Sequence, residues 1–246
     1  MKLALISWLL FNVLLTQAQP GKAAGRFEVY LLIGQSNMAG RGRLDAESRR
    51  ENPRLLLLDS ANQWVPATDP VHFDKLKAVA VGPAISFAQK MLEPDSRQAI
   101  GLIPCALGGS LIKVWQPSAG YLKKFHPYDD ALARARLAMQ QGTLKGILWH
   151  QGESLSDSPP AAQYLKNLVM LISRLRTDLQ RPDLPFVAGE IGYFNKANYL
   201  NPILSQLPRQ VSATAVVSAQ GLTDKGDKLH VDPASARDWI SAMRRP

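Results

Sequence analysis

Residues 27–40 read FEVYLLIGQSNMAG, an apolar run that ends at a glycine and leads at once into a polar segment around Ser36. An uninterrupted apolar run of this length is typical of a parallel strand that is buried on both faces. Five further runs share this character, at residues 54–59, 99–106, 144–150, 185–190 and 214–219. The sequence therefore predicts a series of buried strands.

Amphipathic helical patterns fill the intervals between these runs. The clearest covers residues 160–180, where one apolar stripe contains Leu165, Leu168, Ile172, Leu175 and Leu179. Others are expected from Gly82 onward, over 129–141 with Gly142 as a C-terminal cap, over 197–209, and from Pro233 onward. Strands that alternate with helices build a parallel sheet with helices on both faces, so we expect an α/β fold.

The composition predicts one globular domain. The chain has 246 residues, of which 46% are hydrophobic and 20% charged, and no repeat or linker divides it. The net charge is +9, but the basic residues are scattered and no stacked-aromatic pattern accompanies them, so nucleic acid is not an expected partner. The single cysteine, Cys105, excludes an internal disulfide and is expected to be a buried, inert thiol.

The first residues predict export. Lys2 precedes an apolar run at residues 3–15, and Thr-Gln-Ala at 16–18 offers small residues where a signal peptidase cuts. The run is too short to span a bilayer well, and no later segment is apolar enough, so stable membrane insertion is not expected. We expect a signal peptide over 1–18, a flexible lead-in over 19–25 and one domain over 26–246, in the periplasm or outside the cell. An uncleaved anchor is the alternative.

Polar residues follow the predicted strands at the edge where parallel sheets bind ligands. Ser36 follows the first strand and is either a nucleophile or an ordinary turn or cap residue. Gly109, in a glycine pair after the run at 99–106, offers a backbone N–H to a developing negative charge or forms a left-handed turn. After the run at 144–150, Gln151 offers an amide donor, and Glu153 orients its neighbours or caps a turn.

A serine nucleophile needs a base and an orienting carboxylate. Four histidines are available as the base: His72, His126, His150 and His230. His230 follows the last predicted strand, and Asp227 lies three residues before it in a glycine-bearing loop. Asp232 stands where a helix N-cap is expected, which indicates a structural role, and Asp224 is a weaker rival. The residues thus indicate Ser36, His230 and Asp227 as a candidate triad.

Four segments in this chain resemble the SGNH-hydrolase superfamily, and within it carbohydrate esterase family 6 and the sialate O-acetylesterase-like domains. They are IGQSNMAGRGR at 33–43, IPCALGGS at 103–110, WHQGES at 149–154 and DKLHVD at 227–232, in the family's order. The resemblance implies a flavodoxin-like, three-layer α/β/α fold with a mostly parallel central sheet. It also implies hydrolysis of O-acetyl esters on carbohydrates, with no metal or other cofactor.

By matching position, the resemblance makes Ser36 the nucleophile, His230 the base and Asp227 its orienting carboxylate. The backbone N–H groups of Ser36 and Gly109, with the side chain of Gln151, would form the oxyanion hole. Many SGNH enzymes carry asparagine where this subgroup has Gln151.

An acetylated carbohydrate is the expected partner, while the sugar and the oligomeric state cannot be read from the sequence. Residues expected near the substrate are Gln35, Asn37, Arg41, Trp115 and Glu153. Arg41 would either meet a sugar carboxylate or be solvated, and Trp115, with Tyr121 and Phe125, would either form a sugar platform or pack. Two alternatives stay open: a general lipase or thioesterase, and a non-catalytic carbohydrate-binding protein on the same fold.

Overall fold

A computed structural model describes residues 27–94, 97–154 and 161–241 of the chain. The predicted signal peptide and lead-in lie outside the described residues and stay predictions. Within the described ranges, no helix combines the length and the apolar character that crossing a membrane requires.

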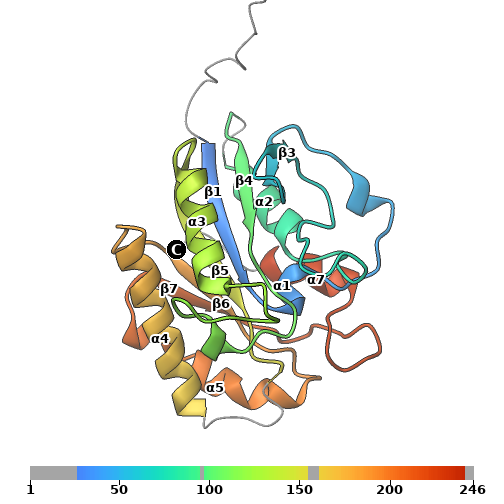
Figure 1. Cartoon of the computed structure of the whole chain (residues 1–246). Coiled ribbons are helices and arrows are strands. Elements are labelled where there is room, and N and C mark those ends of the chain that lie inside the picture. The colour runs from blue at the N-terminus through green and yellow to red at the C-terminus, as the bar shows by residue number, and fades with distance from the viewer. Residues whose placement is uncertain (1–26, 95–96, 155–160, 242–246) are drawn as a thin grey trace, which may run out of the picture.

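A single seven-stranded sheet forms the centre of the protein (Figure 1). Its strand order is β3-β2-β4-β1-β5-β6-β7, and every neighbouring pair is parallel except β2 and β3. The strands are β1 (Phe27–Gly34), β2 (Leu55–Leu58), β3 (Trp64–Pro66), β4 (Ile100–Pro104), β5 (Gly142–His150), β6 (Phe186–Gly189) and β7 (Thr214–Val217). The predicted α/β class and the mostly parallel sheet are confirmed.

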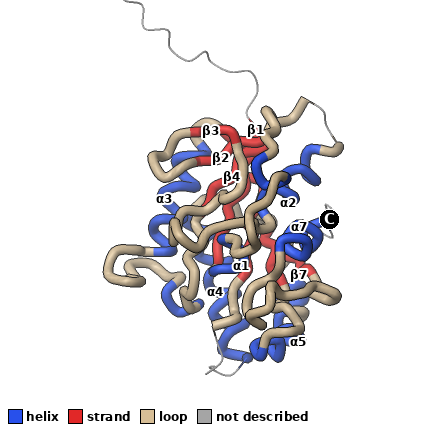
Figure 2. Tube along the Cα trace, turned by 90° about the vertical axis from the view of Figure 1, so that its right-hand side faces the viewer, coloured by secondary structure: helices blue, strands red, loops and turns tan. Residues whose placement is uncertain are grey.

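Helices cover both faces of this sheet, as Figures 1 and 2 show from two directions. The longer ones are α2 (Ala84–Leu92), α3 (Pro127–Met139), α4 (Ala161–Asp178) and α7 (Pro233–Ser241). The short ones are α1 (Ser36–Ala39), α5 (Asn201–Leu204), α6 (Leu207–Gln210) and the 3₁₀ turns η1 (Glu47–Arg49), η2 (Ile112–Val114) and η3 (Lys196–Leu200).

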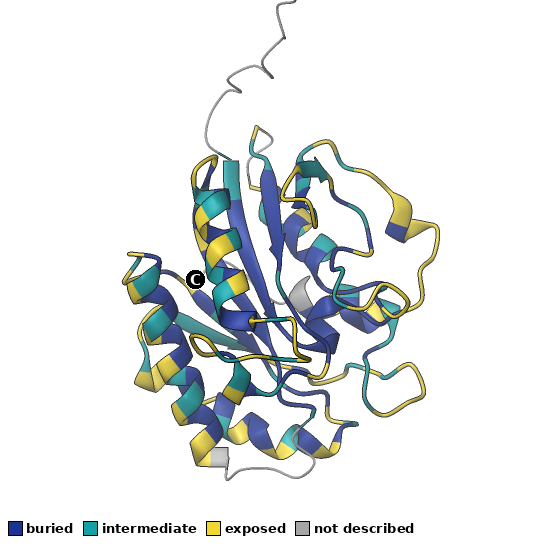
Figure 3. Cartoon of the chain, viewed as in Figure 1, coloured by how far each residue is buried: buried dark blue, intermediate teal, exposed yellow. Residues whose placement is uncertain are grey.

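The core is divided by the sheet into two apolar layers. Along β1, Val29 and Ile33 pack into the layer that contains α3 and α4. Tyr30 and Leu32, which alternate with them, pack into the layer that contains α2 and α7. Figure 3 shows β1 and its neighbours as a buried band between partly exposed helices. Burial on both faces explains why the strands read as unbroken apolar runs.

The structure differs from the expected local structure at three places. Residues 64–66 form an antiparallel edge strand that the sequence analysis did not expect. The region 197–209 is not one helix but η3, α5 and α6, because Pro202 and Pro208 each begin a new short turn. Gly142 does not cap α3 but opens β5, where a Cβ atom would lie 2.5 Å from Cγ1 of Val29 in β1.

Candidate active site

The end of β1 presents Ser36 at the carboxyl edge of the sheet. Gly34 has a φ of +128°, and a Cβ atom there would lie 2.0 Å from the carbonyl oxygen of His150. Glycine therefore lets the ends of β1 and β5 approach, and the Gln35 N–H donates to that His150 carbonyl at 2.8 Å. Ser36 is the first residue of α1, and 7% of the residue is exposed.

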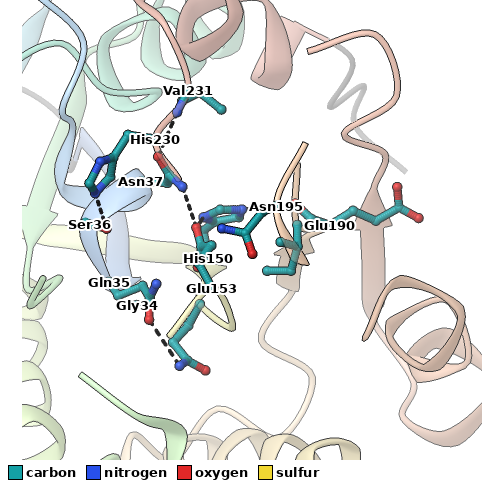
Figure 4. Close-up of polar contacts among 12 residues, drawn as sticks. Gly34, Gln35, Ser36, Asn37, His150, Glu153, Glu190, Asn195, His230 and Val231 are labelled. Carbon is teal, nitrogen blue, oxygen red and sulfur yellow. Dashed lines mark hydrogen bonds and ion pairs between the residues drawn. The ribbon is translucent and has the colours of Figure 1, made fainter. Parts of the chain in front are cut away.

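Ser36, His230 and Asp227 form a continuous chain of hydrogen bonds. Nε2 of His230 lies 3.1 Å from Oγ of Ser36, and Nδ1 of His230 lies 2.7 Å from Oδ2 of Asp227. Figure 4 shows the imidazole above Ser36. A proton on Nδ1 satisfies the carboxylate and leaves Nε2 free to accept the serine proton. The structure thus brings the candidate triad together, in the geometry that nucleophilic catalysis requires.

The Asp227 carboxylate is fixed by its own loop. Oδ1 accepts the backbone N–H groups of Leu229 at 2.9 Å and of His230 at 2.7 Å, while Oδ2 faces the ring. Partial burial on its own raises the pKa of Asp227, but these hydrogen bonds outweigh it and hold the pKa well below its usual range. The group that faces His230 is therefore a carboxylate at neutral pH.

The other acidic candidates in this region shape the loop and the helix. Oδ1 of Asp232 accepts the Ser235 N–H at 2.8 Å at the start of α7. Oδ1 of Asp224 accepts the N–H groups of Gly226 at 2.7 Å and Lys228 at 2.8 Å. Both carboxylates therefore act on backbone groups, as an N-cap and a turn residue do.

The loop after β4 places Gly109 at the surface beside the site. Gly109 is exposed with a φ of +82°, a left-handed conformation that favours glycine. The peptide between Gly108 and Gly109 accepts a hydrogen bond at its carbonyl oxygen from the Tyr121 hydroxyl at 2.9 Å. The Gly108 N–H donates to Oδ2 of Asp74 at 2.7 Å.

Gln151 does not occupy the position expected of an oxyanion donor. Its side chain is fully buried, and Nε2 donates to Oε1 of Gln35 at 3.2 Å and to the carbonyl oxygen of Ser110 at 3.1 Å. The amide protons are thus used to join the loops that follow β1, β4 and β5. Of the expected oxyanion donors, the backbone N–H groups of Ser36 and Gly109 remain candidates. Ser36 opens α1, and the loop that carries Gly109 is joined to the end of β1, where the Leu107 N–H donates to the Gly34 carbonyl oxygen at 2.9 Å.

Gln35, Asn37 and Glu153 are buried, which contradicts their expected place against the substrate. Nδ2 of Asn37 donates to Oε1 of Glu153 at 2.5 Å and to the carbonyl oxygen of Leu229 at 3.0 Å. Oδ1 of Asn37 accepts the Val231 N–H at 3.1 Å (Figure 4). One side chain therefore holds the backbone on both sides of the histidine, and its place is supporting rather than substrate-facing.

His150 is the buried partner of Glu153. The Nδ1 atom of His150 lies 3.1 Å from Oε1 of Glu153, and its Nε2 lies 3.0 Å from the carbonyl oxygen of Glu190. Burial by itself raises the pKa of Glu153, but the imidazole and the Asn37 amide outweigh it, so the pKa is lowered. The ring packs edge-on against Trp239 of α7 at 4.2 Å between centroids.

Arg41 and Trp115 also point into the protein. Nη2 of Arg41 pairs with Oδ2 of Asp74 at 3.0 Å, with the two side chains only 6% and 2% exposed. Trp115 is 2% exposed, packs edge-on against Trp149 and donates from Nε1 to Oγ of Ser110 at 3.1 Å. The sugar-carboxylate role of Arg41 and the platform role of Trp115 are therefore contradicted, because neither side chain faces solvent.

The remaining histidines and the cysteine lie outside the triad. Burial lowers the pKa of His72 to about 3, so the ring is neutral. His126 stands at the residue before α3. Burial raises the pKa of the Cys105 thiol to about 11, so the thiol stays protonated near neutrality. Among the described residues, no group of three or more His, Cys, Asp or Glu is placed to hold a metal ion.

Sequence reasoning did not single out Asp74 at all and treated Tyr121 only as a candidate aromatic surface. Both residues contact Gly108: Asp74 lies 34 residues before this glycine in the sequence, and Tyr121 lies 13 residues after it. Neither residue belongs to one of the four motifs, so no sequence signal marks its contact with the glycine pair.

Comparisons with known proteins show the family to which the chain belongs. Residues 26–243 match the family model described as carbohydrate esterase, sialic acid-specific acetylesterase. A probable carbohydrate esterase of Arabidopsis thaliana is 35% identical over 229 residues, which cover 83% of this chain and 84% of the relative.

Solved structures show the same fold. The crystal structure of that Arabidopsis protein superposes with a TM-score of 0.76 at 30% identity, over 89% of this chain and 96% of the other. NanS, at 19% identity, gives a TM-score of 0.67 and covers 88% and 94%. A carbohydrate acetylesterase from Xanthomonas citri, also at 19% identity, gives 0.63 and covers 88% and 54%. The chain belongs to the carbohydrate esterase family of sialic acid-specific acetylesterases.

Proposed function

We propose that the protein is a serine esterase that removes O-acetyl groups from carbohydrates through an acetyl-serine intermediate. The observation that carries the proposal is the hydrogen-bonded chain from Ser36 through His230 to Asp227, with links of 3.1 and 2.7 Å. The family supports the substrate class, since it comprises sialic acid-specific acetylesterases and the plant relative is named a probable carbohydrate esterase.

In the first half of the reaction, Nε2 of His230 takes the proton from Oγ of Ser36 as this oxygen attacks the acetyl carbon. The bond between that carbon and the sugar oxygen then breaks. The sugar oxygen takes the proton from His230 and leaves as a hydroxyl. Asp227, which is ionised, stabilises the imidazolium between these steps.

In the second half, water gives a proton to His230 and attacks the acetyl-serine. The bond to Ser36 breaks, the serine oxygen recovers the proton, and acetate is released. In both halves the carbonyl oxygen becomes negative and meets the N–H groups of Ser36 and Gly109. Each such donor is worth on the order of 10²–10³ in rate.

An acetyl group is the acyl group that the family supports, since the matching family model describes acetylesterases. Ser36 is 7% exposed, so only a small part of the residue meets solvent. A series of p-nitrophenyl esters of increasing chain length tests this point: an acetylesterase prefers the acetate, whereas a lipase or thioesterase prefers longer chains. Acetate release from acetylated xylan, acetylated sialic acid and acetylated pectin fragments then identifies the sugar.

The decisive variant is Ser36→Ala, with Ser173→Ala on the exposed face of α4 as the matched control. We expect Ser36→Ala to abolish hydrolysis of p-nitrophenyl acetate and labelling by a fluorophosphonate, with folding unchanged, while the control keeps both. Turnover by Ser36→Ala would remove this serine from the role. A wild-type protein that neither hydrolyses nor labels would support the alternative of a carbohydrate-binding protein.

We also infer that the protein is exported, on the strength of the leader-like pattern in residues 1–18. Expression of the full chain in a bacterium, followed by cell fractionation and sequencing of the N-terminus, tests this. Cleavage predicts a mature chain that starts at Gln19 outside the cytoplasm. An intact N-terminus in the cytoplasm would contradict the inference.

A further inference from the structure

The glycine pair after β4 is held by three side chains that lie outside the triad: Arg41, Asp74 and Tyr121. We propose that this set, called here the glycine clamp, orients the peptide between Gly108 and Gly109 so that the Gly109 N–H faces the reacting carbonyl oxygen. The inference rests on the proposed esterase function and assigns Tyr121 as a positioning residue for it.

Tyr121 holds the peptide between Gly108 and Gly109 at its carbonyl side. The carbonyl of Gly108 and the N–H of Gly109 belong to one planar trans unit and point in opposite directions. The Tyr121 hydroxyl donates to that carbonyl oxygen at 2.9 Å, so it fixes the direction of the N–H on the other side. A hydrogen bond at the oxygen also polarises the peptide and makes its N–H a stronger donor.

Tyr121 is suited to remain a donor. Burial raises the pKa of its phenol, and the nearby carboxylate of Asp74 raises it further, so the hydroxyl keeps its proton in the range where an imidazole base works. A phenolate at this position would repel the carbonyl oxygen and release the peptide.

Asp74 holds Gly108 at its N–H group. Its N–H donates to Oδ2 of Asp74 at 2.7 Å, and the same oxygen pairs with Nη2 of Arg41 at 3.0 Å. Nη1 of Arg41 donates to the carbonyl oxygen of Gly40 at 2.7 Å, directly after the nucleophile helix α1. The buried ion pair therefore ties the glycine loop to the segment that carries Ser36.

Close contacts at Gly108 and the backbone conformation of Gly109 explain why both positions are glycine. A Cβ atom on Gly108 would lie 2.4 Å from Nη2 of Arg41 and 2.9 Å from Oδ2 of Asp74. A side chain at Gly108 would therefore push the ion pair away, and the φ of +82° disfavours one at Gly109. The glycine clamp therefore requires glycine at both positions. Without the clamp, this flexible glycine pair would be free to turn the Gly109 N–H away from the site.

The test is Tyr121→Phe, which keeps the ring and removes only the hydroxyl. Tyr193→Phe is the matched control, because the Tyr193 hydroxyl also donates to a neighbour, Oε2 of Glu190 at 3.3 Å, from an exposed position. Loss of a whole oxyanion donor costs on the order of 10²–10³ in rate, and the clamp only orients one. We therefore expect kcat for p-nitrophenyl acetate to fall about 10-fold in Tyr121→Phe.

Two further readouts separate orientation from packing or sugar contact. KM for p-nitrophenyl acetate should stay within about twofold, and the rate of fluorophosphonate labelling should fall in parallel with kcat, because both reactions place negative charge against the same N–H. The melting temperature should stay nearly unchanged, since Tyr121 is partly exposed and its ring is kept. The control variant should keep wild-type values throughout.

Each other outcome overturns a defined part of the scheme. Unchanged kcat and labelling in Tyr121→Phe, with an active wild type, would refute the clamp and leave the esterase proposal standing. A raised KM for acetylated carbohydrate with unchanged kcat would make Tyr121 a sugar contact instead. A wild type that fails to hydrolyse esters, or a Ser36→Ala variant that still does, would overturn the proposed function and the clamp together.

Discussion

The change Asp227→Asn removes one charge and almost no volume from the triad. In the native loop, Oδ1 of Asp227 accepts two backbone N–H groups and Oδ2 faces Nδ1 of His230. An asparagine that keeps its oxygen on the two N–H groups must turn its amide nitrogen toward the ring. The imidazole then accepts at Nδ1 and carries its proton on Nε2, which can no longer take the proton from Ser36.

The expected cost follows from this loss of the correct tautomer and of the charge that stabilises the imidazolium. We expect kcat to fall on the order of 10⁴-fold, equivalent to about 5 kcal/mol of barrier. The matched control is Asp232→Asn, whose Oδ1 accepts the Ser235 N–H at 2.8 Å. Asparagine is as good an N-cap as aspartate, so the control should keep its rate and nearly all its stability.

The assay is the initial rate of p-nitrophenyl acetate hydrolysis for both variants, at several pH values, with thermal melting to show that each is folded. A folded Asp227→Asn variant that keeps more than a tenth of the wild-type rate would refute the assignment. A larger loss in Asp232→Asn than in Asp227→Asn would move the orienting role to Asp232.

Three other perturbations follow from the supporting structure. Asn37→Ala should lower the free energy of unfolding by about 3 kcal/mol, since its buried partners are left unsatisfied; an unchanged urea midpoint would contradict this. Burial raises the pKa of Asp69 from 3.8 to about 7, so its contribution to stability is lost as pH rises from about 4 to 7. At pH 8, Asp69→Asn should therefore raise the free energy of unfolding by at most about 4 kcal/mol and raise the melting temperature with it. At pH 4 the substitution should change both little, and equal shifts at the two pH values would contradict the prediction. EDTA should leave hydrolysis unchanged, and a loss restored by a divalent metal would count against the serine mechanism.

The sheet could be read from the sequence because its strands are buried on both faces and stand out as apolar runs. The edge strand β3 could not, since it has three residues, ends in a proline and pairs only with β2. Helix breaks at Pro202 and Pro208 were readable in principle, but the apolar periodicity of 197–209 masked them. Glycine is the residue expected at the C-terminal end of a helix, and only the packing of Gly142 against β1 shows that it begins a strand.

The proximity of Ser36, His230 and Asp227 could be predicted because each of them follows a strand inside a short motif. The orientation of the neighbouring side chains could not, since motifs give proximity along the chain and not direction. Arg41 was placed near the substrate, but its charge is used by Asp74, 33 residues away. Asn37 was also placed near the substrate, but its side chain donates to Glu153, which lies 116 residues further along the chain. Pairings at such distances come from the topology alone.

Ser36 and His230, the candidate nucleophile and base, are separated by 194 residues. The strands of the described residues all precede His230 in the chain, so the segment that carries the candidate base contributes no strand to the sheet. A chain shortened before this segment would keep Ser36 but lack the candidate base, and it would also lose the buried Val231 and Trp239 from the apolar clusters. The proposed chemistry thus depends on a segment that adds no strand to the sheet, and it would be lost with that segment.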